Sequence, residues 1–535
     1  MKSQRVLVTA LVAVVAFLSG GWLLQRGSQG GQNVYQKARL FDDILTYVAE
    51  YYVDTLNEGQ LYDMAIDGML RQLNDPYTTY LREKDLRELE LSTTGNYAGV
   101  GMQIDVRDGW ITVVAPIAGT PAEELGIESG DRIVEIDGES TRGWDNDHAV
   151  RELRGPAGTK VKLTIVRPGV TDSLQFEPTR ARIHVTSMQY AGALSGGEVA
   201  YVSFVNSSIS ETTGSELGRA VDSLRQRGAK SLIVDLRGNP GGVLDQGIAV
   251  ADLFLARGDV VAETRGRAPG SSQKYRDERP ERWPGMPVVV LVDGGTASAA
   301  EIIAGALQDH DRALVLGTPT FGKGLVQTVY PLNQREALKL TTGRWYTPSG
   351  RTIQRPLSQA QAEQADTAGH PDSAAADTAH LFRTAGGRTV SGGGGIRPDV
   401  TVRGDTLTDG EKEFARELGG NIPAYRDVLT SYALELKGQN QIKSPAFQVT
   451  PAMRAELLRR LRAKGVRLTD AQWEGGAGLV TDQLAFEITR YVFGRPAEFA
   501  RRVSEDAQVK RAVELLTVAR TPKELLALAQ RPAPD

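Results

Sequence analysis

The sequence predicts an α/β (α+β) protein of several domains, and two features of the chain support this. Its 535 residues exceed the length at which a single hydrophobic core stops growing. Segments with apolar residues at helical spacing alternate with short β-branched runs typical of buried strands. The formal net charge of −4 gives no electrostatic reason to expect nucleic-acid binding, and the lack of cysteine excludes disulfides, thiol catalysis and cysteine-ligated metal.

The N-terminal segment, residues 1–26, has the pattern of an export signal. Lys2 and Arg5 precede an apolar run from Val6 to Leu24, which is long enough for a signal peptide or a single spanning helix. No Ala-x-Ala site follows this run, so we favour an uncleaved anchor whose basic end stays inside. The rest of the chain would then be exported to a periplasmic or other extracytoplasmic space. A buried core helix is the alternative.

Residues 34–90 are predicted to form two or three helices. Apolar residues recur there at helical spacing, at Leu40, Ile44, Leu45, Val48, Tyr52, Leu61, Ala65, Met69 and Leu70. The simplest interpretation is a set of packing helices.

Residues 92–172 have the pattern of a small β-rich domain. Residues 97–104 combine a Gly-rich loop with the start of a strand, so that the loop N–H groups can bind a carboxylate and the strand can accept a peptide. Gly-Asp-Arg-Ile at 130–133 and Asp-Gly at 137–138 indicate a further strand and turn. A packing module without a ligand is the alternative.

A candidate nucleophile lies in the run Gly-Gly-Thr-Ala-Ser-Ala-Ala-Glu at 294–301. The β-branched strand Val288–Val292 precedes this run and an apolar helix, 302–307, follows it. Ser298 therefore falls in the first turn of a helix, where it can attack a carbonyl while a neighbouring N–H stabilises the oxyanion. The alternative is that Ser298 is only an N-cap residue.

A serine nucleophile needs a base, and Lys323 is the candidate. None of the 5 histidines lies in a Gly-rich turn, although distance in sequence leaves a histidine base open. Lys323 lies between Gly322 and Gly324, which indicates a closely held backbone. To act as a base, its pKa must fall from about 10.4 to near 7 through desolvation. A surface turn or an anion contact is the alternative.

These motifs, in this order, resemble the carboxyl-terminal processing peptidases, also called tail-specific proteases. The similarity rests on 296–301, on Gly322-Lys323-Gly324 and on Gln327, and it extends over roughly Leu40 to Val402. It implies a serine peptidase in which Ser298 is the nucleophile, Lys323 the general base and Gln327 the residue that orients the lysine. It also implies hydrolysis without a metal or other cofactor.

The resemblance further implies a circularly permuted PDZ domain at 92–172, embedded ahead of an αβ peptidase core at 173–402. The PDZ domain would bind the apolar C-terminal tail of a polypeptide substrate, with Val100, Gly101 and Met102 nearest to the tail. Some members of the family dimerise through the helical segment that precedes the PDZ domain, so a homo-oligomer is a possible state.

Asp-Leu-Arg-Gly-Asn-Pro-Gly-Gly at 235–242 matches another motif of the family. We assign the oxyanion hole to the N–H of Gly241 or Gly242 together with that of Ala299. A phosphate site is the alternative, but the P-loop pattern is absent from this run. Asp235 and Arg237 are interpreted as a structural ion pair.

Two segments carry no chemistry in this interpretation. Residues 358–380 are rich in Ala, Gln, Asp and Ser and are predicted to be a mobile insertion in the core. Residues 408–535 are predicted to be a charged helical region that packs on the core, supports oligomerisation or binds an adaptor protein.

The sequence thus favours an exported Ser/Lys endopeptidase that recognises C-terminal tails. The first alternative is a PDZ-containing scaffold with a silent peptidase core. The second is a non-peptidase hydrolase or a retinoid-type binder on the same core, which the placement of the PDZ domain disfavours.

Overall fold

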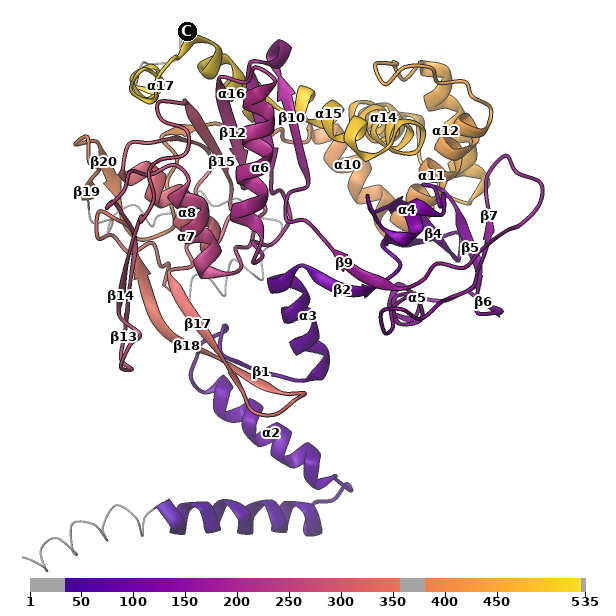
Figure 1. The fold of residues 1–535 in the computed structure, drawn as a ribbon. Helices are drawn as coiled ribbons and strands as arrows, with labels where there is room; N and C mark the ends of the chain where they lie inside the picture. The colour runs from indigo at the N-terminus through magenta and orange to yellow at the C-terminus, as the bar shows by residue number, and fades with distance from the viewer. Residues whose placement is uncertain (1–33, 357–380, 531–535) are drawn as a thin grey trace, which may run out of the picture. The chain divides into compact units, whose positions relative to one another are not determined.

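The computed structural model describes residues 34–356 and 381–530, which Figure 1 colours by residue number. The signal or anchor segment predicted at 1–26 and the insertion predicted at 358–380 lie outside the described residues. Within the described ranges, none of the helices is both long enough and apolar enough to cross a membrane.

The chain divides into two compact units, each with its own internal contacts. Unit 1 comprises Met1–Arg82 and Val329–Thr341, and unit 2 comprises Glu83–Thr328 and Thr342–Asp535. The described elements of unit 1 are a helix over residues 34–51, α2 (Glu58–Arg71), β1 (Thr79–Leu81) and the adjoining parts of β17 (Leu325–Pro331) and β18 (Ala337–Tyr346). Strand β1 pairs antiparallel with β18, although it lies within residues 34–90, where only helices were predicted.

In unit 2, the predicted PDZ stretch folds as an antiparallel sheet with two short helices (Figure 1). The sheet order is β3-β4-β5-β7-β8, with β6 paired to β5, so β3 is an edge strand. The bounds are β3 (Met102–Arg107), β4 (Trp110–Pro116), α4 (Pro121–Glu124), β5 (Arg132–Ile136), β6 (Glu139–Ser140), α5 (Asn146–Leu153), β7 (Leu163–Val166) and β8 (Leu174–Phe176). Ile111 and Val113 of β4 are fully buried and belong to one apolar cluster with Ala149 of α5.

The predicted peptidase core is built on a six-stranded sheet in the order β10-β11-β12-β15-β16-β21. All neighbouring pairs are parallel except β10 with β11. The bounds are β10 (Tyr190–Leu194), η1 (Ser195–Gly197), β11 (Val199–Ser203), β12 (Ser231–Asp235), β15 (Val288–Val292), β16 (Leu314–Gly317) and β21 (Val400–Thr401). This arrangement confirms the predicted α/β (α+β) class.

Helices cover both faces of this sheet, which explains its uninterrupted apolar strands. Side chains of α6 (Thr213–Gln226), α7 (Leu244–Asp252) and α8 (Ala299–Asp309) pack with Val234 and Val290 on one face. The other face, with Ile233 and Val289, is covered by α16 (Ala507–Val518) and α17 (Pro522–Ala529) (Figure 1). The end of the predicted C-terminal helical region therefore completes the core.

The remaining elements of unit 2 frame this core. Its second sheet contains β13 (Val260–Gly266), β14 (Gln273–Arg276) and the end of β18, and a hairpin joins β19 (Leu381–Arg383) to β20 (Thr389–Ser391). A separate helical cluster contains α10 (Asp409–Leu418), η3 (Gly419–Asn421), α11 (Ile422–Gly438), α12 (Pro451–Ala463), α13 (Asp470–Gly475) and α14 (Ala477–Phe493). Helix α15 (Arg495–Glu505) instead contributes Val503 to the cluster that contains Ile233 of the central sheet. Helix α3 (Glu83–Thr94) leads into β2 (Asn96–Gly99), which pairs with β9 (Ala181–His184).

Candidate active site

Ser298 lies at a sharp turn between the central strand β15 and helix α8. Its backbone has φ 54° and ψ −118°, a left-handed conformation. Such a conformation costs a residue with a Cβ about 1–3 kcal/mol and persists only where the surrounding structure enforces it. The same strand–turn–helix geometry exposes the serine of nucleophile-elbow hydrolases. Ser298 is also the N-cap residue of α8, but N-cap residues usually adopt β-region dihedrals, so capping alone does not explain this backbone.

The Gly-rich turn after β12 lies directly against the Ser298 turn. A Cβ built on Gly241, whose φ is 87°, would stand 2.6 Å from Ala297 O and 2.8 Å from Ala299 N. The close approach therefore requires glycine at position 241. Asn239 joins the two turns, because its carbonyl accepts from Ala297 N at 2.9 Å.

The N–H groups of the predicted oxyanion hole differ in their partners. The N–H of Gly241 donates to Asn239 Oδ1 at 2.9 Å. Across the described parts of the chain, no acceptor is found for the N–H of Gly242 or of Ala299. Gly242 and Ala299 therefore hold the two N–H groups that a ligand could use.

The loop that carries Lys323 runs beside the start of α8. Phe321 N donates to Thr296 O at 3.0 Å, and Lys323 O accepts from Trp345 Nε1 at 3.0 Å. A Cβ built on Gly322, whose φ is 89°, would stand 2.6 Å from Arg355 Cγ and 3.0 Å from Gly395 N. The flanking glycine thus has the tight backbone placement that the sequence indicated, and Lys323 itself is half-buried.

Glu301 connects these two segments, and the sequence interpretation gave it no role. Its Oε2 accepts from Ser298 N at 2.8 Å and from Lys323 N at 2.9 Å. Its Oε1 accepts from Gly322 N at 2.8 Å and from the hydroxyl of Thr320. Ser298 and Glu301 have the Ser-x-x-Glu spacing of a capping box, which was the signal available in the sequence.

The environment of Glu301 has two opposing effects on its charge. The side chain is fully buried, and burial raises the pKa of its carboxyl. The hydroxyl of Thr320 and the backbone N–H groups of Lys323, Gly322 and Ser298 oppose this effect, because they stabilise the carboxylate. Burial has the larger effect on the pKa, so the net shift is upward. A carboxyl in this place costs folding free energy, which indicates that its hydrogen bonds to the two segments are needed.

The other predicted site residues lie on separate elements. Gln327 lies half-buried on β17, shortly after Lys323. Val100, Gly101 and Met102 lie at the start of β3, where Gly101 adopts φ 82° and its carbonyl accepts from Thr120 Oγ1 at 2.8 Å. These three residues belong to the PDZ stretch, so the structure does not join them to the Ser298 turn.

The described histidines have partners other than Ser298. His184 Nε2 lies 2.7 Å from Glu216 Oε1, and His310 Nε2 lies 2.8 Å from Val260 O. His148 stacks on Trp144 with ring centroids 3.9 Å apart. Among the described residues, no hydrogen bond joins a histidine to Ser298, and no group of three or more His, Cys, Asp or Glu side chains is arranged to hold a metal ion.

Asp235 and Arg237 form the structural ion pair that was expected at the end of β12. Arg237 Nη2 lies 2.5 Å from Asp235 Oδ2, and Arg237 Nη1 lies 2.7 Å from Asp506 Oδ2 at the start of α16. Tyr201 donates its hydroxyl to Asp235 at 2.7 Å. This cluster ties α16 to the strand that leads into the Gly241 turn.

Three family models match the chain. Residues 183–361 match peptidase family S41, residues 112–167 match a PDZ domain, and residues 23–85 match the activating protease CtpB N-terminal domain. The PDZ match lies inside the antiparallel sheet described above, and the S41 match contains both Ser298 and Lys323.

Curated relatives extend this similarity over most of their own length. The carboxy-terminal-processing protease of Bartonella bacilliformis is 40% identical over 327 residues, which cover 60% of this chain and 74% of that protein. The carboxy-terminal processing protease CtpA of Bacillus subtilis is 37% identical over 357 residues, which cover 65% of this chain and 74% of that protein. The chain therefore belongs to peptidase family S41 and is a serine-type carboxy-terminal processing protease with a PDZ domain.

Proposed function

We propose that Ser298 and Lys323 form a Ser/Lys dyad that hydrolyses peptide bonds. Ser298 Oγ attacks the scissile carbonyl, Lys323 Nζ takes the hydroxyl proton and passes it to the leaving amine, and Gln327 orients the lysine. Water then releases the acyl group from Ser298 by the reverse proton path. No metal or other cofactor takes part in this scheme.

The observation that supports this proposal most strongly is the strained backbone of Ser298 at the N-terminus of α8. A residue that served only as a cap would adopt the usual β-region dihedrals without this cost. The shared carboxylate of Glu301 adds support, because it holds the backbones of Ser298 and Lys323 to one group.

We assign the oxyanion hole to the N–H groups of Gly242 and Ala299. Both N–H groups lack an acceptor among the described residues, whereas that of Gly241 donates to Asn239. Gly241 then contributes by having no side chain, because any side chain at this position would collide with the Ser298 turn. The N-terminus of α8 adds its positive dipole end to the same place.

The test is cleavage of an unfolded reporter protein that ends in an apolar tail. The chain lacking residues 1–26 is compared with its Ser298→Ala and Lys323→Ala variants, with and without EDTA. We expect wild-type cleavage to survive EDTA and both variants to be folded but inactive. Lys230→Ala is the control, because Lys230 is an exposed lysine paired with Glu198, and it should keep full activity.

Three outcomes would contradict the dyad. Full activity of Lys323→Ala would exclude Lys323 as the base. Loss of wild-type activity in EDTA would indicate a metal-dependent reaction. Tail binding without any cleavage would favour the PDZ-containing scaffold with a silent peptidase core.

We further propose that the substrates are exported polypeptides whose apolar C-terminal tails bind along β3. Val100, Gly101 and Met102 lie where the Gly-rich loop enters this edge strand, which suits β-augmentation by a peptide. Lys2 and Arg5 before the apolar run Val6–Leu24 support export, with the chain anchored in the inner membrane and its body in the periplasmic or other extracytoplasmic space.

A homo-oligomer formed through the helix at 34–51 is the last part of this proposal. Leu40, Ile44, Tyr47 and Tyr51 lie on one face of that helix and are 58%, 51%, 64% and 74% exposed. A second copy would cover this face. Light scattering should show a monomer for Ile44→Glu and an unchanged oligomer for Asp42→Lys, which reverses an exposed charge on the opposite face of the helix. A monomeric wild type would instead leave the face to an adaptor protein.

A further inference from the structure

The PDZ domain is joined to the peptidase core by two chain crossings that pair with each other. These are β2 and β9, in which Asn96 lies opposite His184 (Figure 1). Just beyond the paired strands, Val185 N donates to Gly95 O at 2.7 Å. The whole PDZ family match, 112–167, lies between the two strands in sequence. We call β2 and β9 the ribbon.

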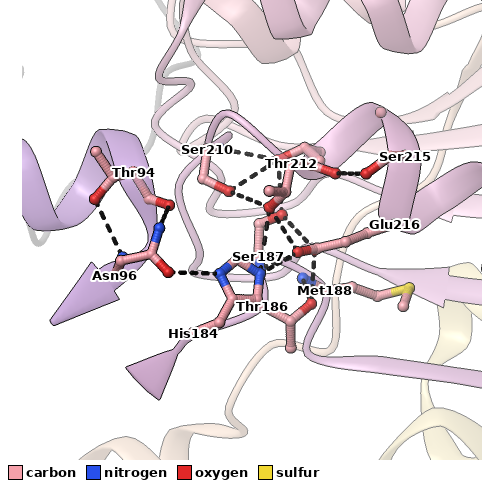
Figure 2. Close-up of polar contacts among 12 residues, drawn as sticks. Thr94, Asn96, His184, Thr186, Ser187, Met188, Ser210, Thr212, Ser215 and Glu216 are labelled. Carbon is pink, nitrogen blue, oxygen red and sulfur yellow. Dashed lines mark hydrogen bonds and ion pairs between the residues drawn. The ribbon is translucent and has the colours of Figure 1, made fainter. Parts of the chain in front are cut away.

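The end of the ribbon nearest to the core is held by the carboxylate of Glu216, in the first turn of α6 (Figure 2). Glu216 is only 6% exposed. Its Oε1 lies 2.7 Å from His184 Nε2 and accepts from Thr212 Oγ1 at 2.7 Å. Its Oε2 accepts from Thr186 Oγ1 at 2.7 Å and from Ser187 N and Oγ at 3.2 and 3.1 Å. The positive end of α6 also stabilises this carboxylate.

His184 connects this carboxylate to the other strand of the ribbon. Its Nδ1 faces Asn96 Oδ1 at 3.3 Å, and the amide of Asn96 is oriented by donation from its Nδ2 to Thr94 O at 2.8 Å. Both ring nitrogens of His184 therefore face acceptor oxygens.

Further hydrogen bonds lead from Ser187, one of the donors to Glu216, to the proposed oxyanion turn. Ser187 Oγ lies 2.7 Å from Thr213 Oγ1, which also accepts from Ser210 N at 2.9 Å. The next residue back, Ile209, donates to Gly241 O at 2.8 Å and accepts from Val243 N at 2.9 Å. Through these two hydrogen bonds, Ile209 and Gly242 form an isolated parallel β-bridge. A short chain of hydrogen bonds joins the ribbon to this turn.

We propose that Glu216 is a positioning residue that couples the placement of the PDZ domain to the oxyanion turn. This inference rests on the proposed function, because it takes tail binding by the PDZ domain and the role of Gly242 from it. A tail that favours one placement of the ribbon favours one arrangement of the donors around Glu216. Since Ser187 shares that carboxylate with His184 and its hydroxyl contacts Thr213, the same arrangement reaches Ile209 and Gly242 through Ser210.

The test compares two substrates that differ only in an apolar C-terminal tail. The tail ratio is kcat/KM for the substrate with the tail divided by kcat/KM for the substrate without it. Glu216→Gln removes one acceptor oxygen and the charge while keeping the size of the side chain. Asp222→Asn is the matched control, because Asp222 lies on the same helix but bonds to Arg282 and Trp283 and not to the ribbon.

We expect Glu216→Gln to move the tail ratio toward one by about fivefold or more, which is the lower end of usual coupling strengths. The change should appear in kcat. The Kd for a tail peptide should change by less than the tail ratio, because Glu216 lies on α6 and does not belong to β3. Asp222→Asn should keep the wild-type ratio. Thr212→Val, which removes a single donor, should shift the ratio in the same direction and serves if Glu216→Gln does not fold.

Several results would overturn the inference. These are an unchanged ratio in both Glu216→Gln and Thr212→Val, an equal shift in Asp222→Asn, a change confined to Kd, or a wild-type ratio of one. Failure of the dyad is seen separately, as wild-type protein that does not cleave or as a Ser298→Ala variant that does.

Discussion

The backbone N–H groups of Ser298 and Lys323 donate to the same oxygen, Oε2 of Glu301, at 2.8 and 2.9 Å. The proposed nucleophile follows β15, whereas the proposed base lies in the loop after β16. One buried carboxylate therefore joins the two backbones, in addition to the hydrogen bond from Phe321 N to Thr296 O. Its remaining oxygen holds Thr320 and Gly322 of the same lysine loop.

Glu301→Gln should lower kcat far more than it lowers stability. Glutamine keeps the size of the side chain but places an NH₂ group against N–H donors, so the Lys323 loop shifts away from Ser298. A displacement of about 1 Å costs about 10²-fold in rate, and we expect a loss of that order. Turnover of the reporter and a thermal melt, measured together, check this.

The control is Glu411→Gln, which changes the equivalent capping-box residue of α10. Glu411 accepts from Thr408 N at 2.9 Å and from Leu479 N at 2.8 Å, away from the Ser298 turn. It should leave kcat unchanged. A similar loss of kcat in both variants would show that the effect of Glu301 comes from helix capping in general.

Ser298 and Lys323 could be singled out from the sequence because each lies in a short motif with its own local geometry, and their catalytic roles stay predictions. The role of Glu301 was not, although its spacing from Ser298 is a capping-box pattern. Its second set of donors comes from the loop at 320–323, and the sequence does not show that this loop returns to α8. In the same way, the sequence did not show that the side chain of Asn239 folds back onto its own turn. Its Oδ1 accepts from Gly241 N, which leaves the N–H of Gly242 rather than that of Gly241 for a ligand.

Gly241→Ala should abolish cleavage. The new Cβ would stand 2.6 Å from Ala297 O and 2.9 Å from Ser298 Cβ, so the oxyanion turn must move away from the nucleophile. Loss of one oxyanion donor costs about 10²–10³ in kcat, and we expect at least that loss. Gly258→Ala is the control, because Gly258 has φ 96° with nothing within 4 Å of the added Cβ. Equal kcat values for the two variants would show that backbone strain alone is responsible.

Ser298→Gly should be inactive yet more stable than Ser298→Ala. Glycine adopts the left-handed backbone of this position without a Cβ penalty, and alanine does not. The gain of about 1–2 kcal/mol is partly offset by the greater freedom of glycine in the unfolded chain, which leaves about 1 kcal/mol. Urea unfolding of the two inactive variants measures the difference. Equal stability would mean that the turn relaxes once the serine is removed.

The contribution of Glu216 to stability should depend on pH. Burial opposes its ionisation, but hydrogen bonds from His184, Thr186, Thr212 and Ser187 outweigh burial and lower the pKa of its carboxyl. A lowered pKa in the folded state gives stability that is present above the unfolded pKa of about 4.3 and is lost as the pH falls through the folded pKa. Glu216→Gln does not titrate at this position.

The difference in unfolding free energy between wild type and Glu216→Gln should therefore be largest near pH 7, at about 1–3 kcal/mol, the usual cost of an unsatisfied buried polar group. It should shrink below about pH 4. Denaturant unfolding at several pH values measures it. A difference that stays constant or grows toward acid pH would show that the carboxylate is not preferentially ionised in the folded state.

The α/β class was predictable because buried strands such as Val288–Val292 are continuous apolar runs. The sequence interpretation ended the core at residue 402 and expected the helical region 408–535 to pack on it. It did not specify that α16 and α17 cover the central sheet, because helical spacing shows that a face is apolar but not which surface it covers. Strand β1 was missed for a related reason, since its partner Ala337–Lys339 lies far along the chain.

Leu525→Ala tests whether α17 is part of the peptidase core. Leu525 is fully buried and packs with Leu516 of α16 against the face of the sheet that includes Ile233, so its truncation should lower the free energy of unfolding by about 2–5 kcal/mol. Val518→Ala on the neighbouring helix is the control: Val518 is 63% exposed, and the change should stay within about 0.5 kcal/mol. Denaturant unfolding, followed by a probe in the central sheet, should show one transition that shifts for Leu525→Ala alone. A transition of the sheet that does not move would mean that α17 unfolds independently and that the core ends earlier in the chain, where the sequence had placed it.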